Sequence, residues 1–222
     1  MGLFHSPSII TDGLVLAVDA ANTKSYPGSG STWFDISGNG NNMSLTGPTY
    51  NSDGYFDFDG SNDYATATNN GLGTGADIPF TIEMWINFDT MGSTRWWLAV
   101  IGQYGAGSHH VIGREVSANT QFGIWGGTQN GFSLGTIGIG NWKHLVSTST
   151  GSVLKTYVDG IERDSDSATD YNFTNAQFTI GLRHSTEAYY DGKCAVAKLY
   201  NRALSASEVA QNFEALRGRF GV

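Results

Sequence analysis

The sequence predicts an all-β protein, a sandwich of two antiparallel sheets closed by one short C-terminal helix. Three observations lead to this prediction. Apolar residues recur at alternate positions in many short segments, clusters of Gly, Asn and Asp separate these segments, and helical spacing appears only near the C-terminus. About ten short strands of this kind predict two packed sheets, because one open sheet would leave an apolar face in water.

The clearest strand is expected over residues 80–88, where apolar residues alternate with Glu83, Trp85 and Asn87. One face of this strand should enter a core, and the other should form a second surface. A strong hairpin signal, Asp159-Gly160, lies further along the chain. Similar alternating runs predict strands over residues 14–19, 55–58, 63–67, 96–102, 110–116, 121–125, 142–149, 153–159, 176–182 and 193–200.

The C-terminal helix begins with a full set of local signals. Ser205 can cap the first free backbone N–H groups, and Glu208, three residues on, can reach back to the Ser205 amide. Val209 and Phe213 fall on one apolar face of the predicted helix. Gly218 is expected to end the helix as a left-handed C-cap.

Four short segments along the chain can be compared with the motifs of known families. They are residues 35–42 (DISGNGNN), 58–64 (FDGSNDY), 142–145 (WKHL) and 157–160 (YVDG), and they precede the capped helix. In this order the segments resemble the laminin-G-like, concanavalin-A-like jelly-roll superfamily, which implies a jelly-roll sandwich. With residues 13–19 (GLVLAVD) near its start and 217–221 (RGRFG) at its end, the whole chain is also similar to single-domain structural proteins of tailed bacteriophages, which implies a capsid or tail-associated role.

One domain is expected over residues 13–222, because no Pro- or Ser-rich linker divides the 222 residues. An N-terminal arm, residues 1–12, precedes it. The arm carries apolar residues outside the jelly-roll signatures, namely Leu3, Phe4, Ile9 and Ile10. This pattern suggests the hypothesis that the arm docks into a neighbouring subunit.

The net charge limits the classes of binding partner, and the single Cys limits the chemistry of the thiol. A net charge of −8 with 12 Lys plus Arg argues against a nucleic-acid surface and against binding to anionic membranes, since both need clustered cations. No segment reaches the ~18 apolar residues of a membrane span. Cys194 alternates with apolar positions and is expected to be a buried, inert thiol. The N-terminus shows no signal peptide, which predicts a protein made in the cytoplasm of its host. The resemblance to phage structural proteins implies that the protein is then carried in the phage particle.

Aspartates in tight turns form the strongest chemical signal. Asp35, Asp59, Asp63 and Asp191 supply hard oxygens beside glycines, a combination that suits structural calcium. The family resemblance supports calcium, because laminin-G-like and pentraxin-like jelly rolls often hold it at the rim. The alternative is that these residues only cap turns and tolerate left-handed backbone.

Aromatic residues supply the second candidate site. Of the 6 Trp residues, some should point away from the core, where flat rings can stack on sugars. Trp85, Tyr104 and Trp125 are the predicted glycan-binding residues. The alternative is that the Trp residues pack between the sheets or beneath the terminal helix.

Catalysis is not predicted. Retaining glycoside hydrolases need two carboxylates about 5 Å apart, and Glu83 has no second carboxylate on its predicted strand face. Asp164 and Asp166 are spaced suitably but are expected in a solvated loop. No nucleophile elbow or phosphate loop occurs in the sequence.

Three function classes remain open. The first is a non-enzymatic phage virion structural protein, whether a head-decoration, fibre or tail-associated component, that adheres to glycans on the host surface. Its partners would be other virion proteins, and further copies of itself. The second is a stand-alone, lectin-like carbohydrate-binding module, and the third is a glycoside hydrolase. Fold alone does not separate these classes.

Overall fold

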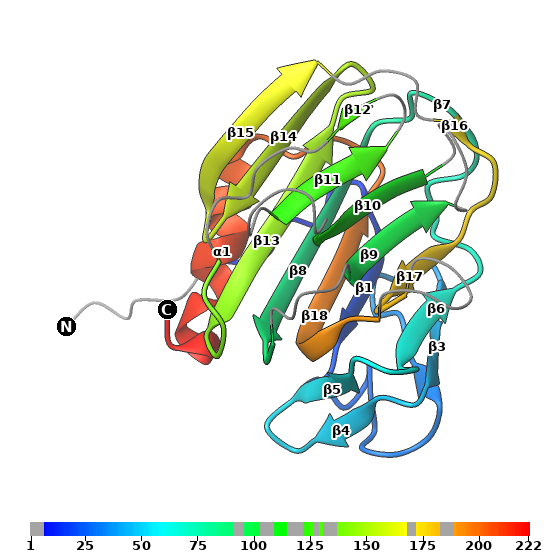
Figure 1. Ribbon diagram of the computed structural model, residues 1–222, viewed down its shortest axis with the longest axis vertical. Coiled ribbons are helices and arrows are strands. Elements are labelled where there is room, and N and C mark those ends of the chain that lie inside the picture. The colour runs from blue at the N-terminus through cyan, green and yellow to red at the C-terminus, as the bar shows by residue number, and fades with distance from the viewer. Residues whose placement is uncertain are drawn as a thin grey trace.

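A computed structural model describes residues 7–90, 96–102, 109–114, 122–126, 129–130, 137–167, 172–182 and 189–222. Two eight-stranded sheets pack face to face, and one helix lies on the outer side of one of them (Figure 1). The predicted all-β sandwich with one C-terminal helix is therefore confirmed. Within the described residues, no helix is long and apolar enough to cross a membrane.

The sheet that carries the helix is called the helix-side sheet. Its order is β15 (Ile161–Ser167), β14 (Val153–Val158), β13 (Trp142–Ser149), β8 (Phe80–Phe88), β18 (Asp191–Tyr200), β5 (Tyr55–Asp59) and β4 (Thr49–Asn51), with β1 (Leu14–Asp19) also paired to β18. All pairings in it are antiparallel. Strands β1 and β13 coincide with the predicted ranges.

The second sheet is called the opposite sheet. Its order is β12 (Gln129–Asn130), β11 (Phe122–Gly126), β10 (His109–Arg114), β9 (Trp96–Gly102), β17 (Phe178–Ile180), β6 (Tyr64–Ala67), β3 (Met43–Thr46) and β2 (Thr32–Trp33). A small ribbon pairs β7 (Gly75–Ala76) with β16 (Asn172–Phe173).

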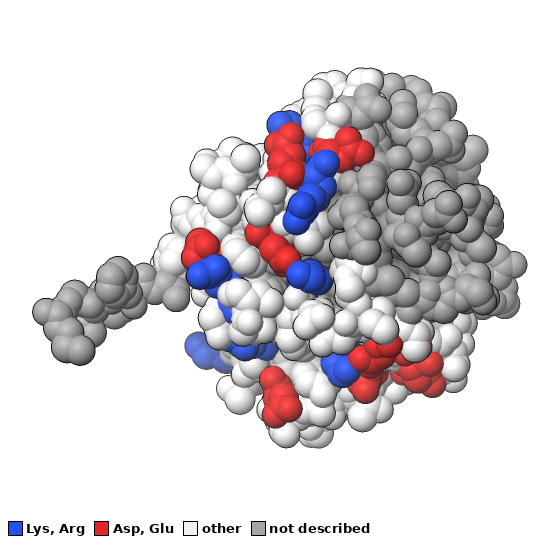
Figure 2. Space-filling view, turned by 60° about the vertical axis from the view of Figure 1, so that its left-hand side comes forward, with Lys and Arg blue, Asp and Glu red and all other residues white. Residues whose placement is uncertain are grey.

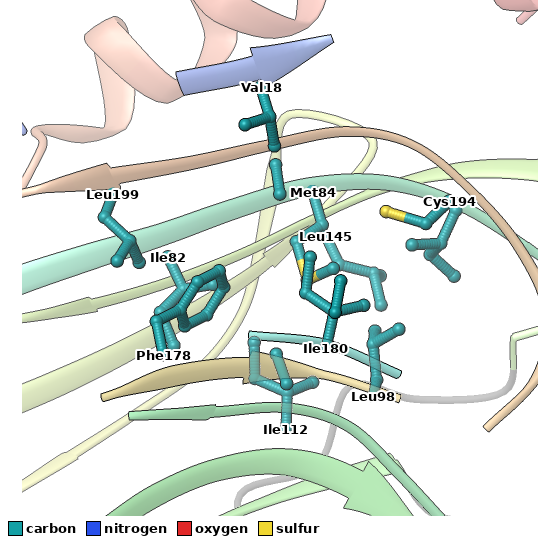
Figure 3. Packing of buried hydrophobic residues seen from close by; sticks show 14 of the residues in the cluster. Val18, Ile82, Met84, Leu98, Ile112, Leu145, Phe178, Ile180, Cys194 and Leu199 are labelled. Atoms are coloured by element: carbon teal, nitrogen blue, oxygen red, sulfur yellow. The ribbon is translucent and has the colours of Figure 1, made fainter. Parts of the chain in front are cut away.

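The main core fills the space between the two sheets (Figure 3). Met84 and Leu145 of the helix-side sheet meet Ile112 and Ile180 of the opposite sheet, and all four are buried. Cys194 is fully buried in the same cluster, and this burial raises the pKa of its thiol well above the ordinary value. The predicted burial of Cys194 is confirmed.

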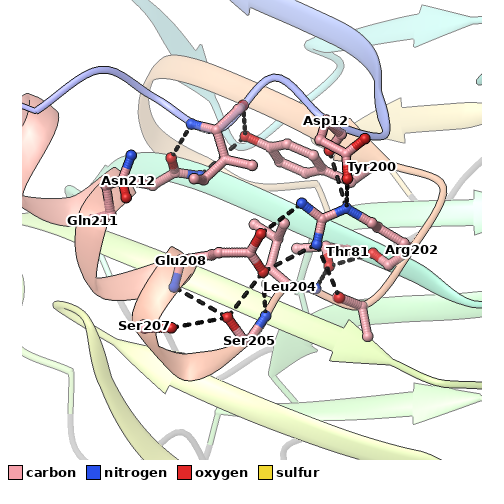
Figure 4. A network of polar contacts seen from close by, with 12 residues as sticks. Asp12, Thr81, Tyr200, Arg202, Leu204, Ser205, Ser207, Glu208, Gln211 and Asn212 are labelled. Atoms are coloured by element: carbon pink, nitrogen blue, oxygen red, sulfur yellow. Dashed lines mark hydrogen bonds and ion pairs between the residues drawn. The ribbon is translucent and has the colours of Figure 1, made fainter.

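Helix α1 (Ala206–Phe220) begins as predicted. The Glu208 backbone N–H donates to Ser205 Oγ at 3.3 Å, and the Ser205 N–H donates to the Glu208 carboxylate at 2.8 Å, which is a capping box (Figure 4). Arg202, which donates to the same carboxylate, lowers the pKa of Glu208 to about 2.

The predicted end of α1 is wrong. The helix continues through Gly218 and ends at Phe220, where Gly221 at φ 70° forms the left-handed cap. Packing explains the extra residues, because the Phe220 ring lies 4.1 Å from the Trp85 ring and 4.9 Å from the Trp142 ring. Contacts of this kind outweigh the small cost of one Gly within a helix.

Helix α1 covers the second face of β8. Trp85 is fully buried there, with its ring stacked on Phe220 at an interplanar angle of 13° and on Phe213 at 10°. The expectation that Trp85 points to solvent on a sugar-binding face is therefore wrong. The predicted alternation of β8 is confirmed, but α1 covers the strand face opposite the core, so that face does not meet water.

The hairpin at Asp159-Gly160 is also longer than expected. Asp164 and Asp166 were predicted in a loop, but they lie in β15, where Asp164 pairs with Thr156 of β14. Polar residues are tolerated in this strand because β15 is the edge of its sheet and stays largely solvated.

The N-terminal arm is tied to the helix of its own chain from Ser8 onward. Gln211 donates to the Ser8 carbonyl, and the Ile10 N–H donates to Asn212 Oδ1 at 2.7 Å. The Tyr200 hydroxyl donates to the Ile10 carbonyl at 3.1 Å. Of the four apolar residues on which the predicted docking to a neighbour rests, Ile10 packs against a core cluster of its own chain. Leu3 and Phe4 lie outside the described residues, so the docking stays a prediction.

We expect Trp85→Ala to lower the free energy of unfolding by about 3–5 kcal/mol, because it removes a fully buried ring and leaves a cavity under α1. Phe34→Ala is the control, since Phe34 is 41% exposed, and its cost should stay within about 0.5 kcal/mol. Urea unfolding followed by circular dichroism measures both. Equal, small costs would mean that Trp85 is not buried beneath the helix.

Candidate ligand-binding groove

An open groove lies at one end of the helix-side sheet. It is bounded by the ends of β5 and β18, by the residue after β8, and by the turns that join β3 to β4 and β5 to β6. Its volume is about 530 Å³, and it is lined by Gly47, Thr49, Asp57, Phe58, Asp59, Asn62, Asp63, Asp89 and Asp191. Most of these side chains are hydrogen-bond acceptors.

Alternation along β5 places two carboxylates in the groove. Phe56 and Phe58 are fully buried in the core, so Asp57 and Asp59 extend to the other face of the strand. The register of β5 with β18 then sets Asp59 opposite Asp191.

The turn between β5 and β6 brings in Asp63. Asp59 Oδ1 accepts the Ser61 N–H at 2.8 Å, and Asp63 Oδ2 accepts the Asp59 N–H at 3.0 Å. Gly47, at φ +90°, makes room for Asp63, because a Cβ at that position would lie 1.9 Å from Asp63 Oδ1. A substitution of Gly47 would therefore displace Asp63 from the groove.

Negative charge is concentrated in the groove. Burial is the main cause that raises the pKa of Asp57, and the nearby carboxylate of Asp89 raises it further. Burial also raises the pKa of Asp63, although the bond from the Asp59 N–H opposes it. Lys193, one strand over, pairs with Asp89. At the height of β4 and β5, Figure 2 shows a surface group in which acidic side chains outnumber basic ones.

The structure brings together three of the four predicted calcium ligands. Asp59, Asp63 and Asp191 line the groove, but Asp35 does not. Its carboxylate accepts the backbone N–H groups of Ala17 at 2.9 Å and Asn41 at 3.0 Å, and so organises a turn elsewhere. The prediction of a shared ligand set including Asp35 is therefore wrong. Among the described residues, no three His, Cys, Asp or Glu side chains are placed to hold a metal ion.

Of the three predicted glycan-binding aromatics, the structure describes the side chain of Trp85 alone. Trp85 is buried beneath α1. Tyr104 lies outside the described residues, and of Trp125 only the backbone is described, paired with Asn130 and Val111. These two assignments stay predictions.

Sequence reasoning missed Asp57 and Asp89. The signal for Asp57 was present in the run Tyr55-Phe56-Asp57-Phe58-Asp59, where alternating aromatics predict two carboxylates on one strand face. Asp89 follows β8 directly, and only the sheet order shows that it faces Asp57 across β18. The same run contributes Tyr55, whose ring meets the ring of Trp142 edge to face at 5.8 Å beside the groove.

Glu83, the nearest carboxylate to a catalytic pattern, is fully buried beneath α1. Lys198 Nζ lies 2.7 Å from Glu83 Oε1, and His144 Nε2 lies 3.2 Å from it without the alignment of a hydrogen bond. Asn212 of α1 and Tyr200 contact the other carboxylate oxygen. Burial alone would raise the pKa of Glu83, but Lys198 and His144 outweigh it and lower this pKa to about 2.

Residues 59–210 match the family model described as the concanavalin A-like lectin/glucanases superfamily. This match covers more than half of the chain and includes five of the nine residues that line the groove and the first turn of α1. The protein belongs to this superfamily. No curated protein sequence matches the chain.

Solved structures with this superfamily fold include enzymes and binding domains. Trypanosoma rangeli sialidase superposes with a TM-score of 0.73 at 18% identity, over 93% of this chain but 33% of the sialidase chain. Domain 4 of AbnA, an extracellular arabinanase from Geobacillus stearothermophilus, superposes in complex with arabinotriose with a TM-score of 0.70 at 17% identity, over 90% of this chain and 97% of that one.

A third structure is the receptor-binding domain of a botulinum neurotoxin C/D mosaic serotype, with a TM-score of 0.62 at 12% identity, over 92% of this chain and 52% of that chain. This superfamily member therefore spans about a third of the sialidase chain and about half of the toxin domain, but nearly all of the AbnA domain. At these identities the likeness shows the fold alone.

We expect Glu83→Gln to cost about 3–5 kcal/mol at neutral pH, because it leaves the buried ammonium of Lys198 without its counter-ion. The pKa of Glu83 falls from 4.5 to about 2 on folding. Its contribution to stability is therefore full above pH 4.5 and is lost as the pH falls toward about 2. The difference in unfolding free energy between wild type and variant should shrink over that window.

Urea unfolding at several pH values measures this difference. Glu208, whose pKa is also lowered to about 2, titrates in both proteins and cancels from the comparison. A difference that stays constant from neutral pH down to about pH 2 would contradict the buried ion pair.

Proposed function

We propose that this protein is a non-enzymatic glycan-binding module that holds carbohydrate in the groove at the end of the helix-side sheet. One observation carries the proposal, namely the match to domain 4 of AbnA over nearly the whole length of both chains. That domain was solved with arabinotriose, so a domain of this size and fold can bind a sugar without further protein. Membership of the lectin/glucanase superfamily supports the same role.

The chemistry of the groove suits a sugar. Carboxylates such as Asp57 and Asp191, the amide of Asn62 and the hydroxyl of Thr49 can bond to sugar hydroxyl groups. The partly exposed rings of Tyr55 and Trp142 lie beside the groove and can stack on the C–H face of a neighbouring sugar unit.

A glycoside hydrolase is the second candidate. The observation that favours it is the set of carboxylates in the groove, two of which, Asp57 and Asp63, have raised pKa values as a general acid requires. We favour binding because Asp59 and Asp63 accept backbone N–H groups within their own turn and are committed to its structure.

Placement in a phage particle is a separate proposal. It is supported by the resemblance of the whole chain to structural proteins of tailed bacteriophages, which would make other virion proteins its partners and host-surface glycans its ligand. Mass spectrometry of purified phage particles tests it. Detection at a fixed ratio to the major capsid protein is expected, and absence from the particles would contradict this placement.

We expect Asp191→Asn to weaken glycan binding about tenfold or more, because it removes a charged acceptor from the groove. Asp159→Asn, which changes a carboxylate paired with Lys143 outside the groove, should leave binding unchanged. Calorimetry against arabinotriose and a panel of neutral and charged oligosaccharides measures both. No binding to any glycan would contradict the proposal, and release of reducing ends would favour the hydrolase.

Calcium binding stays a prediction for Asp59, Asp63 and Asp191. If these carboxylates turn toward one ion, excess calcium should raise the melting temperature and EDTA should lower it, because a ligand that binds only the folded state stabilises it. Asp63→Asn should abolish the response and Asp35→Asn should not. Identical melting curves in calcium and EDTA would contradict a calcium site.

A further inference from the structure

The charge of the groove is unbalanced. Asp57, Asp59, Asp63, Asp89 and Asp191 line it, and no Lys or Arg is among the described residues that do so. Lys193 borders the groove, but its ammonium is already paired with Asp89. Five carboxylates against one ammonium leave a site that attracts cations and repels sugar acids.

Asn87 adds an independent observation. It pairs in register with Lys193 on one side and Trp142 on the other, so the three side chains share the outer face of the sheet. Lys193 in turn pairs with Asp57 of β5. Asn87 therefore lies in a row across the sheet that starts at Trp142 and ends at the groove residue Asp57. Asn87 is 7% exposed, and within the described residues its Oδ1 has no hydrogen-bond partner. An acceptor left unpaired in this way is suited to a donor brought by a ligand.

Two of the groove carboxylates, Asp57 and Asp63, are crowded by burial and by their acidic neighbours. Burial and neighbouring carboxylates raise the pKa of Asp57, and burial raises that of Asp63. A cation between them would relieve this repulsion. A donor with a positive charge therefore suits both features, the crowded carboxylates and the unpaired amide oxygen, better than a neutral hydroxyl does.

We propose that the groove selects glycans with free amino groups, and that the sugar ammonium binds near Asp57, Asp89 and Asn87 while the next unit stacks on Tyr55 and Trp142. This inference rests on the proposed glycan-binding function and adds the substrate class. Lys193 would give up part of its contact with Asp89 when the sugar ammonium enters.

The test compares matched oligosaccharides by calorimetry. A chitosan tetramer with free amines is compared with its fully N-acetylated counterpart and with an oligogalacturonate, at about pH 6, which lies above the ordinary pKa range of carboxyl groups. The aminated tetramer should bind about tenfold more tightly than the acetylated one, and about 0.5 M salt should reduce that preference. The oligogalacturonate should not bind.

Variants identify the residues that cause the preference for amines. Asp57→Asn and Asp89→Asn should each reduce the preference for amines, whereas Asp53→Asn, an equal charge change in the exposed turn before β5, should not. Melting curves confirm that each variant folds. The measurements are repeated in EDTA and in excess calcium, so that a need for calcium in glycan binding is detected.

The outcomes separate the two proposals. Equal binding of the aminated and acetylated tetramers would overturn the amine preference and leave the glycan-binding function standing. An Asp53→Asn effect as large as that of Asp57→Asn would show general charge attraction and also overturn it. Binding of no oligosaccharide in either buffer would overturn both.

Discussion

Three parts of the chain that are distant in sequence meet at the buried carboxylate of Glu83. Lys198 supplies the counter-charge from β18, Asn212 donates from α1, and Asn212 also accepts the N–H of Ile10 in the arm. A charge removed from water is tolerated only when ion pairs and hydrogen bonds surround it, so the helix and the arm must dock where these partners meet. The position of α1 over the sheet depends on this contact.

Docking of α1 divides the outer face of the helix-side sheet into two parts. Beneath the helix, the Trp85, Phe213 and Phe220 rings stack and close the surface to ligands. Beyond the last turn of the helix, the same strand face continues as Trp142, Asn87 and the carboxylates of the groove. The helix therefore covers one part of this outer face and leaves the groove at the end of the sheet uncovered.

The sequence predicted those features of the fold that depend on signals within a few residues. Alternation set the strands, and the spacing of Ser205 and Glu208 set the start of α1, because these signals act over a few residues. It did not predict that Trp85 is buried, since only the docked helix decides which strand face meets water. It placed Asp59, Asp63 and Asp191 in one site but missed Asp57 and Asp89, whose meeting depends on the sheet order and on the registers about β18.

We expect carbohydrate to bind to the open part of this face and not to the part beneath α1. Titration of isotope-labelled protein with oligosaccharide, followed by nuclear magnetic resonance, tests it directly. Shifts are expected at the backbone amides of Asp57, Asp59 and Asp191, with the indole N–H of Trp85 unchanged. Shifts concentrated at the Trp85 indole and along α1, with the groove amides unmoved, would contradict it.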